Sequence, residues 1–440
     1  MSSHFPAYTA LAAAFILTTG MASAADLFQV YRDALANDAR YAAARAQYEA
    51  DREKVVQGRS GLLPTVAASA GANRNDDEVE DLQGNKTEKR YSSSNYALQL
   101  TAPLFRPQNW RRYQENALQT ELAGSIFTQE TQALILRTAE AYFNVLNARD
   151  ALSAITQLRT AAGEQLELAR ASFQVGTVTV TDVHEAQSRF DLASAQEISA
   201  RNTLDVAYEA LTRIIGHTPE HLAGLKPGVT LSPPEPTDIS IWVDAAEKND
   251  LGVQGQTLMR EIAVRALGRE RAGHLPTLDL VASIRRSNNP SMTAEHNDSR
   301  IVGLQLDMPL YQGGAVSSRT REAAALKIKA DADLEEARRA AALAAREAYL
   351  GVTSGMAQVR ALEAAQVSSA SALEANRLGY KVGVRINIDV LNAQSQLADT
   401  LQQLSRARYD TMLAQLRLKA AVGTLGEDEV RAINALLETN

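Results

Sequence analysis

The amino-acid sequence predicts an α+β protein in which two similar halves each place two β-strands among very long helices. Three observations lead to this prediction. Short motifs recur about 207 residues apart along the 440-residue chain. Each half holds two segments in which apolar and polar residues alternate, as they do in strands with one apolar face. Proline is absent from residues 108–218 and 310–440, which allows helices of unusual length.

The repeat is carried by matching motifs in the two halves. Residues 98–105 (LQLTAPLF) resemble residues 304–311 (LQLDMPLY) at a shift of 206. Other pairs recur at a shift of 207: Ala141-Tyr142 with Ala348-Tyr349, Val175-Gly176 with Val382-Gly383, and Asp182-Val183 with Asp389-Val390. This period is too long for a solenoid repeat, so it indicates an old duplication of one structural unit.

The chain divides accordingly into five segments. Five prolines between residues 217 and 240 mark a linker rather than a regular element. In chain order we expect a signal peptide at 1–24, a first structural repeat at 25–216, the linker at 217–240, a second structural repeat at 241–425 and a C-terminal tail at 426–440.

The first 24 residues have features of an export signal. Residues 10–19 are largely apolar, and Ala22-Ser23-Ala24 offers a small-x-small site for cleavage after Ala24. The segment before them lacks the usual Lys or Arg, so a buried N-terminal helix is the alternative. Export would place the processed chain outside the cytoplasm.

Composition excludes several classes of function. The chain has 45 Lys and Arg against 52 Asp and Glu, a net charge of −7, which argues against nucleic-acid binding. It has no cysteine, which rules out disulfides, thiolate metal sites and cysteine nucleophiles. The GxGxxG, P-loop, HExxH and GxSxG motifs are absent, so we expect neither an enzyme nor a cofactor. His217 and His221 are four residues apart, but the surrounding prolines argue against a metal pair.

The alternating segments predict four strands, and the polar stretch inside each pair predicts a solvated loop. In the second half, Leu278 and Leu280 face one way while Asp279 and Ser283 face the other. The expected strands lie at 65–73, 94–104, 277–285 and 302–310, and the expected loops at 74–90 and 286–300.

Two interpretations of these strands are open. They could form a small sheet on a soluble core, or they could cross a membrane, which a length of about 9–11 residues suits. The aromatic residues Phe105, Trp110 and Tyr311 near the strand ends fit core anchors in the first case and an interfacial belt in the second. In lipid, open strand edges would leave backbone groups unpaired, and four strands are too few to close a barrel. Three chains together would supply twelve strands.

The rest of each half is expected to be helix. Residues 26–60 predict one helix, and residues 107–172 predict a rod roughly 100 Å long at 1.5 Å per residue. The long helices break at 174–181 and 381–388, where Val-Gly and β-branched residues predict a turn. After each break, apolar residues are spaced by three and four, which predicts an antiparallel coiled-coil hairpin in each half. A generic coiled-coil spacer would show the same pattern.

Beyond these patterns, the chain resembles the TolC family of outer-membrane exit ducts, the outer membrane factors, over nearly its whole processed length. The resemblance is carried by four motifs: AYFNVLNA at 141–148, GHLPTLDL at 273–280, GYKVGVR at 379–385 and GTLGE at 423–427. It implies a homotrimer in the outer membrane of a Gram-negative bacterium. Four strands per chain would complete a twelve-stranded transmembrane β-barrel, continued by a long periplasmic α-helical barrel of coiled-coil hairpins.

The resemblance also implies partners and a function. The trimer would be the passive, gated exit duct of a tripartite efflux pump or a type I secretion system. A periplasmic adaptor, or membrane fusion protein, would open its tip and connect it to an inner-membrane pump of the ABC or RND type. The linker and the C-terminal tail would form an equatorial belt.

Four gate residues are implied at the periplasmic entrance. Tyr380 and Arg385 match the gate residues of one coil, and Thr181 and Asp182 match their partners on the other coil. Polar contacts at an aqueous tip are each worth roughly 0.2–1 kcal/mol, so a threefold set would hold the tip shut by a small margin. The alternative is that Asp182 and Asp389 cap the helices that return from the turns.

A selectivity ring is implied one turn further along. Asp389 matches an aspartate that would form a ring of three in a trimer. The family's second ring aspartate falls at Asn392 here, which puts a double acidic ring in doubt.

The rival hypothesis is a periplasmic coiled-coil scaffold or adaptor without a pore. Such a protein would carry one hairpin, a lipoyl-like module and an inner-membrane anchor. Two duplicated hairpins, each preceded by two strands of membrane length, favour the duct.

Overall fold

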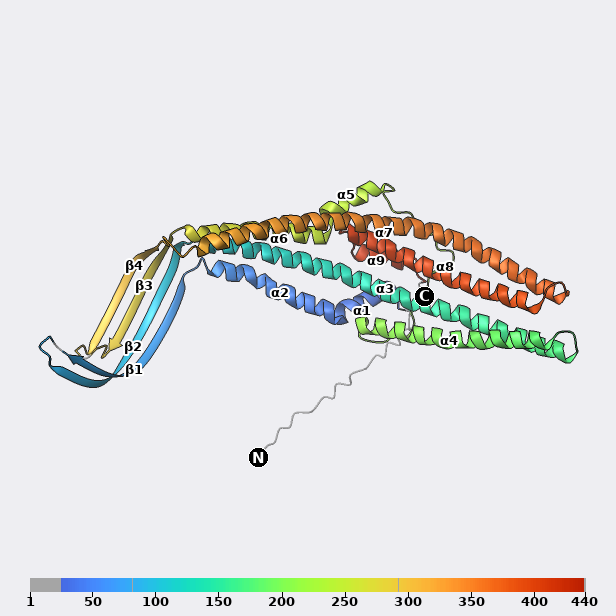
Figure 1. The fold of residues 1–440 in the computed structure, drawn as a ribbon, viewed down its shortest axis with the longest axis horizontal. Coiled ribbons are helices and arrows are strands. Elements are labelled where there is room, and N and C mark those ends of the chain that lie inside the picture. The colour runs from blue at the N-terminus through green and yellow to red at the C-terminus, as the bar shows by residue number, and fades with distance from the viewer. Residues whose placement is uncertain (1–24, 81, 292, 439–440) are drawn as a thin grey trace, which may run out of the picture.

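The computed structural model describes residues 25–80, 82–291 and 293–438, and the predicted signal peptide at 1–24 lies outside these ranges. The molecule is elongated, with a four-stranded sheet at one end and the turns of two helical hairpins at the other (Figure 1). Within the described ranges, no helix combines the length and the apolar character needed to cross a membrane. The elements are α1 (Leu27–Asn37), α2 (Ala39–Ser60), β1 (Thr65–Glu80), β2 (Lys86–Phe105), α3 (Pro107–Gln174), α4 (Val180–Ile215), α5 (Ile239–Asn249), α6 (Leu251–Arg271), the 3₁₀ turn η1 (Ala272–His274), β3 (Thr277–Asn288), β4 (His296–Asp307), α7 (Ala315–Lys381), α8 (Asn387–Ala421) and α9 (Glu427–Asn434).

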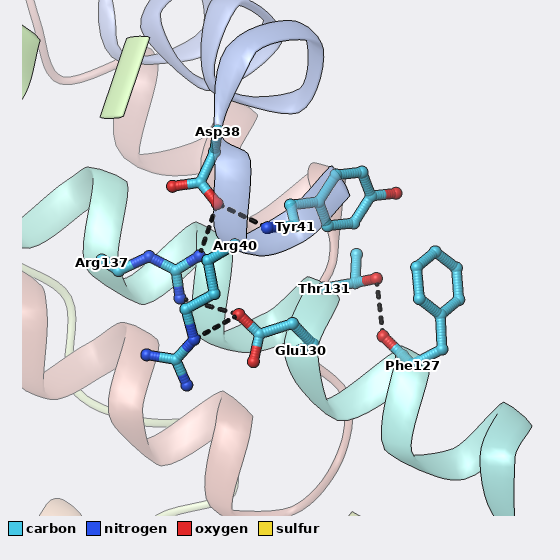
Figure 2. A network of polar contacts seen from close by, with 7 residues as sticks. All are labelled: Asp38, Arg40, Tyr41, Phe127, Glu130, Thr131 and Arg137. Atoms are coloured by element: carbon cyan, nitrogen blue, oxygen red, sulfur yellow. Dashed lines mark hydrogen bonds and ion pairs between the residues drawn. The ribbon is translucent and has the colours of Figure 1, made fainter. Parts of the chain in front are cut away.

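The single helix predicted before the first strand is wrong, because Asp38 divides it into α1 and α2. The Asp38 carboxylate accepts a hydrogen bond from the Tyr41 backbone N–H (2.6 Å) and so caps α2. It also accepts one from Arg137 of α3 (3.1 Å). Arg137 and Arg40 each approach Glu130 to 3.0 Å, which completes a small charged network (Figure 2). The cap therefore also holds the bend between α1 and α2 against α3.

The strands form one antiparallel sheet in the order β1-β2-β3-β4. Leu98 of β2 lies opposite both Ala68 and Ile284, and Leu280 lies opposite Leu304. Directly opposite residues share a face, so the apolar faces predicted for the two halves merge into one. That face is uncovered, with Leu304 67% exposed, and the sheet projects beyond the helices (Figure 1). The interpretation as a sheet packed on a soluble core is therefore wrong.

The strands run further than predicted into the loops expected at 74–90 and 286–300, so those loops are wrong, whereas β4 ends at Asp307 and not at the expected residue 310. Pairing of β1 with β2 continues to Glu80 opposite Lys86, and pairing of β3 with β4 continues to Asn288 opposite His296. Both faces of these outer segments are polar, so they lack the alternation that identifies a strand. Cross-strand ion pairs line them instead: Lys86 with Glu78 (2.7 Å), Arg90 with Asp76 (2.9 Å) and Arg286 with Asp298 (2.8 Å).

Ion pairs tie the sheet to the helices. Arg106, between β2 and α3, makes a bidentate contact with Asp279 of β3, whose Oδ1 lies 2.7 Å from the arginine Nε. Asp279 is buried, so its charge needs this partner. Further along, Arg269 of α6 reaches Glu115 of α3 at 2.5 Å. The two halves of the chain are therefore locked together where strands become helices.

The two long hairpins are confirmed. α3 has 68 residues and α7 has 67, and each turns back through a short loop into α4 or α8. Gly176 and Gly383 take left-handed backbone angles in these loops (φ 77° and 80°), which is why Val-Gly marks both turns. The returning helix α4 buries Ala186, Ala193 and Ala200 against its partner, as the predicted seam requires.

One polar residue occupies this seam. Glu197 of α4 is 7% exposed at a position where the spacing predicts an apolar side chain. Its carboxylate contacts Arg159 at 3.0 Å and Arg201 at 3.2 Å. Because both partners reach it from the rim of the seam, the buried charge is compensated without breaking the hairpin.

The main core lies at the waist of the molecule, where α1, α9 and the linker meet α3, α4 and α8. Tyr142, Phe143 and Met412 are fully buried there. The Tyr142 hydroxyl donates to the linker carbonyl of Ala223 (2.6 Å). The Tyr409 hydroxyl donates to Asp150 (2.8 Å), and burial together with that carboxylate raises the pKa of Tyr409. The linker and the tail are therefore structural parts of the core rather than free connections.

We expect the close approach of α7 to α8 to tolerate no side chain at Gly355. A Cβ there would collide with the Thr411 hydroxyl, whereas a Cβ at Gly351, one turn away, would lie at an ordinary 3.6 Å from Ala414. Gly355→Ala should lower the free energy of unfolding by about 1–3 kcal/mol. Gly351→Ala should leave it unchanged or raise it by up to about 1 kcal/mol. Urea-unfolding midpoints of the two variants would contradict this if they moved together.

Alkaline pH should loosen the waist through Tyr31. Burial, followed by the nearby Glu427 and Tyr41, raises the pKa of Tyr31 to about 12. The folded state thus favours the neutral phenol, and its stability contribution is intact below pH 10 and lost as pH rises toward about 12. The loss should amount to roughly 2–3 kcal/mol. Melting temperatures between pH 9 and pH 12 should fall less steeply for Tyr31→Phe than for the unaltered protein, and equal slopes would refute the assignment.

Candidate functional site

The six residues singled out for the entrance belong to the parts of α4, α7 and α8 next to the hairpin turns, and these turns lie at the end of the molecule opposite the sheet (Figure 1). Thr181 and Asp182 begin α4, and Tyr380 ends α7. Arg385 lies in the turn before α8, and Asp389 and Asn392 occupy the first turns of α8. Both hairpins therefore contribute to one tip.

In the turn of the first hairpin, between α3 and α4, Asp182 acts as a capping residue. Its Oδ2 accepts a hydrogen bond from the Thr179 N–H at 2.8 Å. In return the Thr179 hydroxyl oxygen accepts from the Asp182 N–H at 3.3 Å. This reciprocal pair is a capping box, so the alternative capping role of Asp182 is confirmed. Thr179, which the sequence reasoning missed, is the cap residue, and the S/T-x-x-D spacing signals it.

In the turn of the second hairpin, between α7 and α8, Gly379 makes room for Arg385. A Cβ on Gly379 would lie 2.7 Å from the Arg385 Cγ, so only glycine lets the arginine stem lie across the end of α7. The Gly379 carbonyl accepts the N–H groups of Val384 (2.9 Å) and Arg385 (3.2 Å). Asp389 Oδ2 lies 3.6 Å from Arg385 Nη1 and forms a long contact with the Ile386 N–H (3.5 Å). Asp389 therefore faces both the helix start and a cation of its own chain.

A single chain does not join the gate residues of the two hairpins. Among the described residues, no hydrogen bond or ion pair connects Tyr380 or Arg385 to Thr181 or Asp182. Arg385 and Thr181 are exposed, and Tyr380 is half-buried at the end of its helix. These side chains are thus available to a neighbouring molecule.

Near the tip, a polar contact between the hairpins involves Asn392. Its Oδ1 accepts a hydrogen bond from Arg189 Nη2 of α4 at 3.0 Å. Sequence reasoning identified Asn392 but missed Arg189, because the two are 203 residues apart and no local pattern links them.

Beside this contact, α8 packs onto the first hairpin through a seam with buried amides. Leu391 of α8 is buried among Ala162, Leu166, Ala169 and Ala186. Asn387 and Gln394, each 5% exposed, lie on the same face of α8, four residues before and three after Leu391. Within the described part of the chain, Asn387 Nδ2 and Oδ1 and Gln394 Oε1 have no hydrogen-bond partner. The hairpins thus meet through a mixed surface rather than a purely apolar one.

The tip carries charged and polar side chains from both hairpins. Across residues 25–80, 82–291 and 293–438, no group of three or more His, Asp or Glu side chains is placed to hold a metal ion. Asp182 and Asp389 each face a backbone N–H at the start of their helix, and Asp389 also faces Arg385.

Comparisons with known proteins agree with this geometry. The family model for "Outer membrane efflux protein" matches residues 30–217 and 242–424. The chain is 33% identical to outer membrane protein TolC of Vibrio cholerae over 421 residues, which cover 94% of each chain. It is also 33% identical to the proteases secretion protein PrtF of Dickeya chrysanthemi over 435 residues, covering 96% of this chain and 93% of PrtF.

Solved structures share the fold. The outer membrane protein VceC of Vibrio cholerae superimposes with a TM-score of 0.78 at 17% identity, covering 90% of this chain and 96% of VceC. The open state of the MtrE channel of Neisseria gonorrhoeae gives a TM-score of 0.74 at 19% identity, covering 92% of this chain and 91% of MtrE. The chain therefore belongs to the outer membrane efflux protein family, and it is an exit duct of the outer membrane with a periplasmic extension, of the kind that serves efflux and type I secretion.

Proposed function

We propose that three copies of this chain form the duct and that each contributes four strands to one twelve-stranded barrel. The observation that carries this proposal is the four-stranded sheet whose outer strands, β1 and β4, have no strand partner on their outer edges among residues 25–80, 82–291 and 293–438. In lipid, each unpaired backbone group costs several kcal/mol, so the edges must be completed by neighbouring chains. The long hairpins would continue the wall as a helical barrel, and the duct would be passive, without an enzymatic step of its own.

The exposed apolar face of the sheet supports this placement in lipid. Val302, Leu304 and Leu306 of β4 are between 67% and 78% exposed in the single chain. The opposite face carries Gln305 and its neighbours, which suit a water-filled lumen. Trp110 and Tyr311, 51% and 86% exposed where sheet meets helices, are not core anchors, and we assign them to the interfacial belt.

Native mass spectrometry of the detergent-extracted outer membrane protein should give three times the mass of the processed chain. Leu304→Arg would place a charge in lipid at a cost of about 2–4 kcal/mol, and it should sharply reduce the trimer recovered from outer membranes. Gln305→Arg, its neighbour on the polar face of β4, is the matched control and should leave the yield intact. A monomer of the unaltered protein, or equal yields of the two variants, would refute the barrel.

We also propose that the gate contacts form between neighbouring chains. Tyr380 and Arg385 of one chain would meet Thr181 and Asp182 of the next. This proposal is supported by the position of all four residues at or beside the hairpin turns, and by the absence of a hydrogen bond or ion pair between the two sets within the described part of one chain. Asp389 would form the ring of three in the lumen. Arg385 already lies 3.6 Å from Asp389 of its own chain, so its guanidinium would contact its own Asp389 and the neighbour's Asp182 together.

Loss of these contacts should open the duct. In planar bilayers, we expect the Tyr380→Phe, Arg385→Ser double variant to conduct several times more current than the unaltered trimer, because contacts of roughly 0.2–1 kcal/mol are removed three times over. Lys381→Ser removes an equal charge from the same turn and is the control, with conductance unchanged. Equal conductance in all three proteins would remove the gate assignment while leaving the fold in place.

The partners we propose are a periplasmic adaptor and an inner-membrane pump of the ABC or RND type. Apolar side chains project from both turns: Val175 and Val384 are each 75% exposed, and Val382 is 66% exposed. Exposed valines on a periplasmic tip suit a protein partner that covers them. The adaptor would supply the binding energy for opening, and the pump would select the cargo.

A further inference from the structure

The contact between Arg189 and Asn392 places a fixed positive charge beside the proposed entrance. Arg189 Nη2 donates to Asn392 Oδ1 at 3.0 Å, across the boundary between α4 and α8. Glu185 lies one turn before Arg189 on α4, a spacing that often forms an ion pair. Among the described residues Arg189 has no ion pair with it, so the guanidinium is directed to α8 and keeps its charge uncompensated by a carboxylate.

The acidic residue that precedes Asn392 on α8, Asp389, is already paired with a cation. Asp389 precedes Asn392 by three residues and therefore lies on the adjacent turn of the same helix. Its Oδ2 is 3.6 Å from the Arg385 guanidinium. The level of the tip that holds Asp389 thus carries paired charges, and the level that holds Asn392 carries a cation without an acid.

The net charge of the whole tip also gives cations little advantage over anions. The chain has a net charge of −7, but residues 167–192 and 374–392 together carry a net charge of only −1. Their five basic residues are Arg170, Arg189, Arg377, Lys381 and Arg385, and their six acidic residues are Glu167, Asp182, Glu185, Asp191, Glu374 and Asp389. Fixed charges act over about 8–10 Å in physiological salt, so a nearly balanced tip presents no extended acidic field to passing ions.

We propose that Arg189 sets the ion selectivity of this duct and makes its narrow entrance nearly unselective between cations and anions. This inference rests on the proposed trimer, in which the face of α8 bearing Asp389 and Asn392 lines the entrance. Three copies would then place three Arg189 guanidinium groups against three Asn392 amides. Their repulsion of cations offsets the attraction left by the three Asp389–Arg385 pairs.

Reversal potentials in planar bilayers under a KCl gradient test the assignment. The unaltered trimer should show a K⁺ to Cl⁻ permeability ratio near one. Arg189→Gln keeps a hydrogen-bonding side chain but removes the charge, and it should raise that ratio by about fivefold, which corresponds to roughly 1 kcal/mol for the three charges together. Adding Asn392→Asp to Arg189→Gln should raise it further.

Two variants serve as controls. Arg189→Lys keeps the charge and should retain the original ratio. Arg170→Gln removes an arginine from the same tip, but Arg170 is held by Glu167 (2.8 Å) and Gln187 (2.6 Å) within its own hairpin, so the ratio should not change.

The outcomes separate this inference from the function on which it rests. Absence of any channel from the purified unaltered protein would overturn the trimeric duct, and this inference with it. A conducting, strongly cation-selective channel whose ratio is the same in Arg189→Gln would overturn the role of Arg189 alone.

Discussion

Unpaired strand edges are the constraint on which the rest of the molecule depends. A sheet of four strands with an exposed apolar face has no stable place in water or, alone, in lipid. No described segment of the chain pairs with either edge. It instead projects the sheet from the end of its helices, and the Arg106–Asp279 pair holds sheet and helices at a fixed angle. Completion of the sheet by other copies, as we propose, explains why so much apolar surface is left open.

The helices meet a different requirement, which is length without bulk. Small residues at the seam positions let α3 and α4, and α7 and α8, approach closely, and Gly355 marks the tightest point. Rods of this length need bracing, which the waist supplies. There Asp38 caps one helix while binding another, and the linker carbonyl of Ala223 binds the buried Tyr142. The linker and the bend at Asp38 thus hold the long helices in place.

The sequence was sufficient for much of this architecture. Local sequence patterns determine the hairpin turns, strand β3 and the long helices. These patterns are the Val-Gly pairs, the alternation around Leu278–Leu280 and the proline-free stretches, and the structure has the three kinds of element where we expected them. The bend at Asp38 was missed because it depends on Arg137, about 100 residues away. The outer strand segments were missed because ion pairs such as Arg90–Asp76 hold them in place of an apolar face.

The tip was predictable by residue but not by pairing. Asp182 and Arg385 were found, yet Thr179 is the partner of Asp182 in the cap, and Asn392 is bound by the unforeseen Arg189. Contacts between polar side chains on separate helices leave no periodic trace in a sequence. They become visible once the two hairpins are placed side by side.

The amides of Asn387 and Gln394 give the contact between the hairpins an unusual energetic character. Buried without partners, such groups each forfeit about 1–3 kcal/mol of hydration. When the hairpins move apart, water recovers those groups while Leu391 and its alanine neighbours lose their apolar cover, so the two changes oppose each other. Under the proposed gate, hydration of the two amides would therefore offset part of the free energy needed to separate the hairpins.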